Sequence, residues 1–165
     1  MFRSASCIWR RKSRKTEPAG RKGQTGMDLY THRIAYYETD RMGVAHHSNY
    51  IRWMEEARVD FLERIGWPYG KMEELGVLSP VIAVNCEYKK STTFDDLVSI
   101  RVTVREARPV KTVIGYVMTN AKTGELVAVG ESSHCYLNRE GRPLSLKRAL
   151  PDFLEKLQSL AEEKL

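Results

Sequence analysis

The chain has 165 residues, the length of one domain, and its hydrophobic and charged fractions of 42% and 29% are ordinary for a globular protein. No apolar run approaches the roughly 20 residues that cross a bilayer, so we expect no membrane span. The net charge of +6 belongs to residues 1–26, which hold eight basic side chains and one acidic one. The remainder is close to neutral, so we expect no strongly basic surface on the folded part.

Residues 10–26 are rich in Gly, Ser, Thr, Lys and Arg and have no apolar periodicity. Such a segment cannot bury enough apolar surface to offset its ordering entropy. We therefore predict a disordered basic tail over 1–26 and a folded domain over 27–165. A solvated tail is the favoured interpretation, because charge runs usually lie in solvent, and no nucleic-acid partner is expected. The alternatives are an arm for nucleic acid or a membrane surface, and a transit-type presequence.

The three cysteines, Cys7, Cys86 and Cys135, are widely spaced and form no C-x-x-C pair. Their odd number and spacing argue against a disulfide framework and against a zinc site. We therefore predict no bound metal and a reducing, cytoplasmic compartment.

The first predicted strand covers residues 29–37, which are rich in Tyr, Thr and Ile, and a polar loop follows over 38–47. The strongest helical pattern spans 49–65, where apolar residues recur at spacings of three and four. Ser48 or Asn49 can cap its first turn. The apolar stripe of this helix consists of Tyr50, Trp53, Met54, Ala57, Phe61, Leu62 and Ile65.

After a short helical turn at 69–75, the hydrophobic pattern changes from the helical to the strand period. Four more strands are predicted, followed by a short amphipathic helix over 150–160. The strands cover 78–89, 97–106, 111–120 and 125–137. One long helix with a largely antiparallel sheet is an α+β arrangement, and the broad apolar girth of the helix predicts that the sheet wraps it closely.

Several common catalytic patterns are missing from the sequence. There is no glycine-rich phosphate loop and no G-x-S-x-G elbow, which argues against a phosphate-loop enzyme and a serine hydrolase. His46 and His47 are adjacent and their side chains diverge, so this pair alone is a poor metal site.

Ionisable groups concentrate in residues 36–58, where a loop leads the chain into the long helix. Asp40 precedes the flexible Gly43, and His47 stands at the helix entrance. The first turn of a helix has unpaired N–H groups and a positive dipole end, which suit a developing oxyanion. A carboxylate one loop away can act as base or nucleophile on a carbonyl polarised there. The alternative is an Asp40 that only caps the turn.

The run T-D-x-x-G-V-x-x-H-x-N-Y-x-R-W-x-E-E-A-R covers residues 39–58. It resembles the signature of the 4-hydroxybenzoyl-CoA thioesterase-like acyl-CoA thioester hydrolases, and the order of elements agrees over residues 30–160. The resemblance implies a hotdog fold, in which a five-stranded, mostly antiparallel sheet wraps a long central helix. It also implies hydrolysis of acyl-CoA or acyl-carrier thioesters without a cofactor, by a homodimer or homotetramer with sites at subunit interfaces.

Carried over by position, the resemblance implies that Asp40 is the catalytic carboxylate. It places His47 at the helix N-terminus, where its backbone N–H would polarise the thioester carbonyl and its imidazole is implicated too. His46 stands where many relatives have an aromatic residue such as Tyr, which puts the shape of the acyl pocket in question. The expected substrate contacts, with the two lysines as candidate partners of the CoA phosphates, are Gly43, Val44, His46, Asn49, Tyr50, Lys89 and Lys90.

Other interpretations stay open. A second hotdog branch uses a helix carboxylate, so Glu55 and Glu56 are alternative catalytic groups, although such residues commonly pair with basic neighbours at i,i+4. We expect ion pairs between these acids or Asp60 and the arginines of the helix, Arg52, Arg58 and Arg64. His32 and His134 are expected to be structural. The alternative functions are a hotdog hydratase or dehydratase on acyl thioesters and a non-catalytic acyl-thioester binding module.

Overall fold

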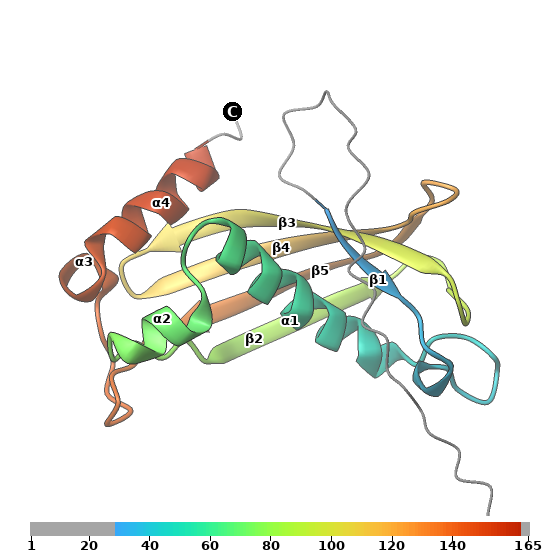
Figure 1. Ribbon diagram of the computed structural model, residues 1–165, viewed down its shortest axis with the longest axis horizontal. Coiled ribbons are helices and arrows are strands. Elements are labelled where there is room, and N and C mark those ends of the chain that lie inside the picture. Colours follow the sequence, from blue (N-terminus) through green and yellow to red (C-terminus); the bar gives the residue numbers. More distant parts are fainter. Residues whose placement is uncertain (1–28, 163–165) are drawn as a thin grey trace, which may run out of the picture.

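The computed structural model describes residues 29–162, in which one long helix lies across one face of a five-stranded sheet (Figure 1). The predicted tail over 1–26 lies outside the described residues, as do residues 27–28. The strands are β1 (Tyr30–Arg33), β2 (Val81–Tyr88), β3 (Leu97–Arg108), β4 (Lys111–Asn120) and β5 (Leu126–Cys135). The helices are the 3₁₀ helix η1 (Tyr36–Glu38), α1 (His47–Arg64), α2 (Tyr69–Glu74), α3 (Leu146–Ala149) and α4 (Pro151–Glu162). Within these residues no helix combines the length and the apolar character needed to span a bilayer.

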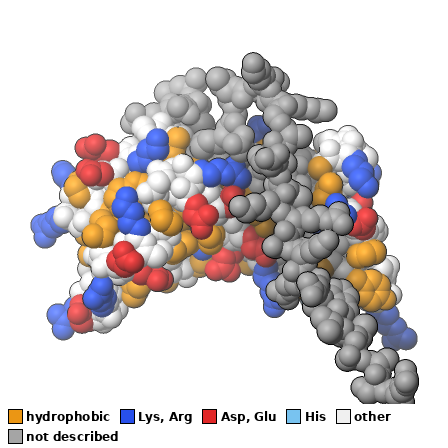
Figure 2. Space-filling model, viewed as in Figure 1, with side chains coloured by type: hydrophobic (Ala, Val, Ile, Leu, Met, Phe, Trp, Pro, Cys, Tyr) orange, Lys and Arg blue, Asp and Glu red, His pale blue; other side chains and the backbone are white. Residues whose placement is uncertain are grey.

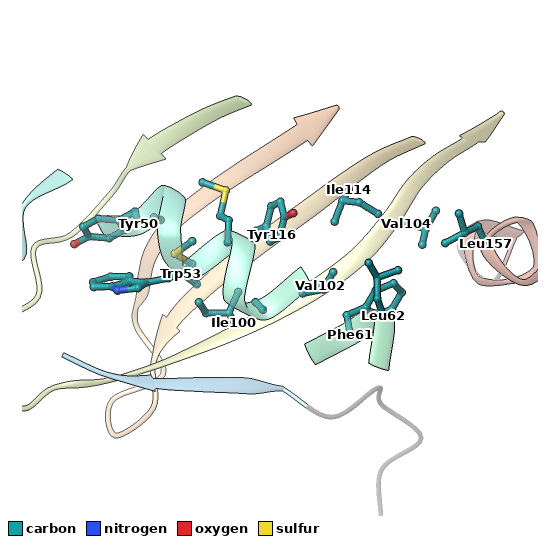
Figure 3. Packing of buried hydrophobic residues seen from close by; sticks show 14 of the residues in the cluster. Tyr50, Trp53, Phe61, Leu62, Ile100, Val102, Val104, Ile114, Tyr116 and Leu157 are labelled. Atoms are coloured by element: carbon teal, nitrogen blue, oxygen red, sulfur yellow. The ribbon is translucent and has the colours of Figure 1, made fainter. Parts of the chain in front are cut away.

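The sheet has the strand order β1-β3-β4-β5-β2, and every neighbouring pair is antiparallel. β3, β4 and β5 follow one another in the chain, whereas β2 precedes them and takes the far edge beside β5. The alternation predicted for β3 is confirmed, because the residues on one of its faces are all buried: Val98, Ile100, Val102 and Val104. This face meets α1 (Figure 3), so the period-two pattern decides which side of the sheet carries the helix.

The apolar stripe of α1 faces the sheet and forms the centre of the core (Figure 3). Each fully buried large side chain contributes about 1.5–3 kcal/mol, so this stripe holds the helix on the sheet. The helix packs tightly over Gly130 of β5, where an added Cβ would lie 2.6 Å from Cε of Met54. This approach agrees with the predicted close wrapping, while the outer side of α1, including Ile51, is exposed in the single chain. The buried members of the stripe are Tyr50, Trp53, Met54, Ala57, Phe61 and Leu62.

The first strand is shorter than the predicted 29–37. β1 ends at Arg33, and the chain turns into η1 because the Glu38 carboxylate accepts the backbone N–H of Ala35 at 2.7 Å. This hydrogen bond draws Glu38 inward, away from the strand direction. The later strands and the C-terminal helix agree with the prediction to within a few residues, but the short α3 was not predicted.

The start of α1 also differs from the prediction. The helix begins at His47, and its N-cap is His46, whose Nδ1 accepts the backbone N–H of Ser48 at 3.4 Å. The predicted cap by Ser48 or Asn49 is therefore wrong. Asn49 instead turns its side-chain amide towards the preceding segment, where it donates to the carbonyl of Glu38 at 2.7 Å.

Candidate active site at the N-terminus of α1

Asp40 lies in a tight turn that connects η1 to α1. Its N–H donates to the carbonyl of Val44 at 2.8 Å, and its own carbonyl accepts the N–H of Gly43 at 3.0 Å. Gly43 has a φ of 77°, a left-handed conformation that glycine adopts without the steric cost of a Cβ. The carboxylate Oδ1 accepts the N–H of Met42 at 2.8 Å, while Oδ2 makes no hydrogen bond within the described chain. The turn thus orients the carboxylate through one oxygen and leaves the other free.

The first turn of α1 follows directly. The N–H of His46 donates to the carbonyl of Glu38 at 2.8 Å, which holds the helix start against η1. The N–H of His47 occupies the first helical position, where no intrahelical acceptor exists, and no residue of the described chain accepts from it. The carbonyl of His47 accepts the hydroxyl of Tyr88 at 3.0 Å, and this bond ties the helix start to the end of β2.

A groove of ≈ 280 Å³, which we call the α1 groove, opens beside this helix start. The predicted site residues that line it are Asp40, Val44, His47, Tyr50, Lys89 and Lys90. Its other lining residues are Met42, Ala45, Tyr88 and Ser91. Gly43, His46 and Asn49 do not line it in the single chain; they shape the turn, cap the helix and anchor the helix start. Their contact with substrate stays a prediction.

Two segments far apart in sequence form the α1 groove because hydrogen bonds join them. The N–H of Ala45 donates to the carbonyl of Thr92 at 2.8 Å, and Val44 pairs with Thr93 in a β-bridge. The hydroxyl of Tyr50 lies 3.0 Å from Oγ1 of Thr92, so the helix is attached to the same loop. These contacts bring the lysine-containing loop after β2 beside the Asp40 turn.

Both lysines of the groove already have acidic partners. Nζ of Lys89 lies 2.7 Å from the Glu87 carboxylate, and Lys90 pairs with Glu125. The hydrogen bond and charge of each lysine hold the pKa of its partner carboxylate below the ordinary value. Exposed pairs of this kind are weak because solvent screens them, so an incoming phosphate can compete for either lysine.

Glu38 is a buried carboxylate at the junction between the strand, the turn and the helix, with 5% of its surface exposed. Its Oε1 accepts the indole N–H of Trp53 at 2.7 Å, and its Oε2 accepts the N–H of Ala35 at 2.7 Å. Nε2 of His32 lies 2.9 Å from Oε2. Glu38 therefore ties β1, η1 and α1 together two residues before Asp40.

These contacts also set the ionisation of Glu38. Burial alone would raise the pKa of Glu38, but the hydrogen bonds from Trp53, His32 and the N–H of Ala35 outweigh it and hold the pKa below its ordinary value. Glu38 was not among the site residues predicted from the sequence. The available signal was Trp53, because a buried indole N–H needs an acceptor.

The helix carboxylates considered as alternatives are exposed and do not line the α1 groove. Glu55 and Glu56 lie on the outer side of α1, and Glu56 is 3.2 Å from Nδ1 of His32. The expected i,i+4 ion pair between Asp60 and Arg64 is present. The carboxylate next to the free helix N-terminus is therefore Asp40.

Arg58 differs from the expectation of an ion pair. It is 6% exposed, and its guanidinium donates to the Tyr69 hydroxyl and to Nδ1 of His134 at 3.3 Å, because this position of α1 faces the sheet. Burial and the nearby Arg58 charge lower the pKa of His134 to about 4. His134 is thus a neutral interior side chain at pH 7, in agreement with the structural role expected for it.

The groove offers a limited set of chemical groups. Among residues 29–162, no three His, Cys, Asp or Glu side chains converge as a metal site. Outside the grey atoms, Figure 2 shows acidic and basic side chains interspersed on the face in view. A histidine–carboxylate pair, as a hydratase would need, exists at His32 and Glu38, but neither lines the α1 groove. The charged groups of the groove are the Asp40 carboxylate and the two lysines, and they lie beside the helix N-terminus at His47.

Comparison with known proteins agrees with this arrangement. The family model for the thioesterase-like superfamily matches residues 34–159. The chain belongs to the thioesterase-like superfamily. It is a thioester hydrolase with the α+β hotdog fold predicted from the sequence, in which the sheet wraps α1.

Individual relatives cover most of the chain. YneP of Bacillus subtilis (strain 168), provisionally named an acyl-CoA thioesterase, is 36% identical over 121 residues, which are 73% of this chain and 87% of YneP. The 4-hydroxybenzoyl-CoA thioesterase of Pseudomonas sp. (strain CBS-3) is 22% identical over 129 residues, 74% of this chain and 92% of that one. The crystal structure of a DHNA-CoA thioesterase from Staphylococcus aureus superposes with a TM-score of 0.78 at 33% identity, covering 84% of this chain and 95% of that one.

Proposed function

We propose that this thioester hydrolase cleaves acyl-CoA to the free acid and CoA, with Asp40 as the reacting carboxylate. The observation that carries the proposal is that Asp40 and His47 line one groove at the N-terminus of α1. The names of the relatives, which are thioesterases of acyl-CoA, DHNA-CoA and 4-hydroxybenzoyl-CoA, support CoA as the thiol.

In the proposed mechanism, the thioester carbonyl oxygen faces the free N–H of His47. A helix N-terminus stabilises the negative charge that develops on this oxygen as the carbonyl carbon is attacked. Asp40 keeps Oδ2 free for the chemical step while Met42 holds Oδ1. Asp40 either attacks the carbonyl carbon, expelling the CoA thiolate and forming a mixed anhydride that water cleaves, or deprotonates the attacking water.

Lys89 and Lys90 are proposed partners of the CoA phosphates. They stand together on one wall of the α1 groove, and their present acidic partners are exposed and weakly held. Phosphate contacts of this kind are electrostatic, so we expect the KM for acyl-CoA to rise with ionic strength.

A second copy of the chain is proposed to pair along β2. Among residues 29–162, this edge strand has a strand partner on only one side of its backbone, and its apolar residues are unusually exposed: Val81 50%, Ile82 55%, Val84 42% and Tyr88 47%. Because Tyr88 also lines the α1 groove, pairing there brings the second copy to the groove wall. Light scattering that gives the mass of a single chain would contradict this pairing.

The test of Asp40 is thiol release from short, medium, long and aromatic acyl-CoAs by the wild type and Asp40→Asn. The asparagine keeps an oxygen for the N–H of Met42, so the turn is preserved while the reacting group is lost. We expect kcat/KM to fall at least about 10²–10⁴-fold with little change in the unfolding midpoint. Equal turnover by the variant would exclude Asp40 as the reacting group.

Asp96→Asn is the matched control. Asp96 is also half-buried, and its carboxylate also accepts a nearby backbone N–H, that of Thr93 at 2.9 Å, but it does not line the α1 groove. Its activity should stay near that of the wild type. After a single turnover in ¹⁸O-water, label in Asp40 identifies attack by the carboxylate, because water incorporates there only by cleaving a mixed anhydride at the Asp40 carbonyl.

A further inference from the structure

A small cavity lies at the other end of the core from the α1 groove. It is bounded by the second half of α1, by β4 and β5 and by α4, and leaves ≈ 20 Å³ of room for the centre of a water-sized group. One water needs roughly 10–15 Å³ on this scale, so the cavity has room for a polar group of about the size of a water. Figure 3 shows three of its lining residues, Leu62, Ile114 and Leu157, far along the core from Tyr50. In the described chain, no residue lines both this cavity and the α1 groove.

The buried side chain of Arg58 lines the cavity, and we call it the Arg58 cavity. Nη1 of Arg58 donates to Tyr69 and His134, and the Tyr116 hydroxyl is a further polar neighbour of the guanidinium. Neither Nε nor Nη2 has a well-aligned acceptor among the described residues. No fully buried polar side-chain atom in these residues lacks a partner, so Nε and Nη2 border open space. The open space next to Arg58 is this cavity.

The charge of Arg58 has no counter-ion within residues 29–162, since none of their ion pairs includes it. Burial lowers the pKa of Arg58, and the Tyr116 hydroxyl and the exposed Glu55 offset this only in part. The other polar groups of the cavity are neutral at pH 7, because burial raises the pKa of Tyr136 to about 12 and lowers that of His134 to about 4. A buried cation without an anion is strongly unfavourable, which points to an anion from outside these residues.

We propose that the Arg58 cavity binds a carboxylate group, which the open Nε–Nη2 edge of Arg58 holds. The two N–H donors on this edge of a guanidinium run parallel and match the two oxygens of a carboxylate. The hydroxyls of Thr112 and Tyr136, 2.5 Å apart, line the same cavity and supply further polar contacts. The remaining wall is apolar, with Met72 and Phe153 among its residues.

The carboxylate has two chemical sources. One is a free short-chain acid. The other, which rests on the proposed thioesterase function, is a carboxylate at the far end of the substrate's acyl chain. Arg58 follows His47 by eleven residues of the same helix, about 16 Å along its axis, so only a long acyl chain could reach it.

The site itself is tested by thermal unfolding of the full-length chain in sodium formate and in sodium chloride at equal ionic strength. Formate has two oxygens for the open edge of Arg58 and chloride does not. We expect formate at about 100 mM to raise the unfolding midpoint by about 3–5 °C above chloride. Equal midpoints in the two salts would overturn the proposal, because Arg58 would then be satisfied within the protein, for example by a carboxylate of a second copy.

Two variants test whether the rise of the unfolding midpoint in formate arises at Arg58. Arg58→Met keeps the length of the side chain and removes the guanidinium, so the formate shift should vanish. Arg58→Lys keeps the charge but lacks the two parallel donors, so the formate shift should fall by at least half. If Arg58→Met does not unfold cooperatively, Arg58→Lys serves as the test in its place. A formate shift as large in these variants as in the wild type would overturn the site.

The source of the carboxylate is tested with dodecanedioyl-CoA and dodecanoyl-CoA, which differ in the far carboxylate. A preference of about tenfold or more in kcat/KM for the diacid, lost in Arg58→Met, supports the acyl-chain source. Equal turnover with the formate shift retained supports a free acid. If the wild type hydrolyses neither thioester, the acyl-chain source is excluded, while the panel of acyl-CoAs still decides the proposed function and the unfolding experiment still decides the Arg58 cavity.

Discussion

Two buried side chains of opposite charge lie along α1, Glu38 beside its first half and Arg58 on its second half. They differ in how many of their polar atoms have hydrogen-bond partners in the chain. Under the first half, both oxygens of Glu38 accept hydrogen bonds from residues of this chain, on β1, before η1 and on α1. Under the second half, Arg58 uses one nitrogen for Tyr69 and His134 and leaves two nitrogens open to a cavity.

The difference indicates what each charge does. Glu38 is satisfied by the fold, so its charge holds the Asp40 turn and the start of α1 in one arrangement. Arg58 has donors that the described chain does not use, so its charge is available to a ligand. A buried charge is therefore informative about function when its partners within the chain are incomplete.

The largest expected effect on stability is that of Glu38→Gln, which removes one acceptor oxygen from the fully hydrogen-bonded Glu38 side chain. Each carboxylate oxygen accepts a donor that cannot reverse its role, the N–H of Ala35 on one and the indole N–H of Trp53 on the other. Glutamine offers only one oxygen, so one buried donor must face an NH₂ group. We expect the free energy of unfolding to fall by about 3–5 kcal/mol, measured by urea unfolding.

Glu56→Gln is the control for this variant. Glu56 also lies beside His32, but it is exposed, so the expected change is within about 0.5 kcal/mol. Equal losses of unfolding free energy in the two variants would mean that the burial of Glu38 does not add to its contribution to stability.

A smaller, pH-dependent effect should come from the Arg58 side. Burial and Arg58 depress the pKa of His134 to about 4 from an ordinary 6.5, so between these pH values the unfolded chain binds more protons than the folded one. The stability contributed by neutral His134 is fully present above 6.5 and is lost as the pH falls towards 4. We expect a loss of about 2 kcal/mol between about pH 7 and pH 5, measured by urea unfolding.

His134→Gln should remove this part of the pH dependence. His47→Gln is the control, because His47 is exposed and the slope should remain as in the wild type. A slope that persists in His134→Gln would assign the pH dependence to another group.

The smallest effect is expected for Arg58→Met. The substitution removes an unpaired buried cation and leaves a side chain of similar length, and such replacements are commonly neutral or stabilising. We expect the free energy of unfolding in the absence of added carboxylates to stay within about 1 kcal/mol of the wild type. A loss as large as that of Glu38→Gln would show that Arg58 is as fully satisfied as Glu38 and would remove the contrast between the two halves of α1.

The local patterns of the sequence were enough for the elements and for the family. The 3.6-residue period predicted α1 and its buried stripe, and the two-residue period predicted the strands and the buried face of β3. The run from Thr39 to Arg58 indicated the thioesterase family and singled out Asp40 and His47, which lie on one groove. These features depend on neighbours along the chain, so a single sequence contains them.

Only the tertiary structure decided which distant residues meet. Ala45 joins Thr92, and this contact builds the α1 groove; Trp53 meets Glu38, whose importance the sequence did not reveal. Arg58, expected in an ion pair, meets His134 across a separation of 76 residues. Periodicity shows that a residue points inward but not which polar group it finds there, because the partner of a buried charge depends on how the helix docks on the sheet.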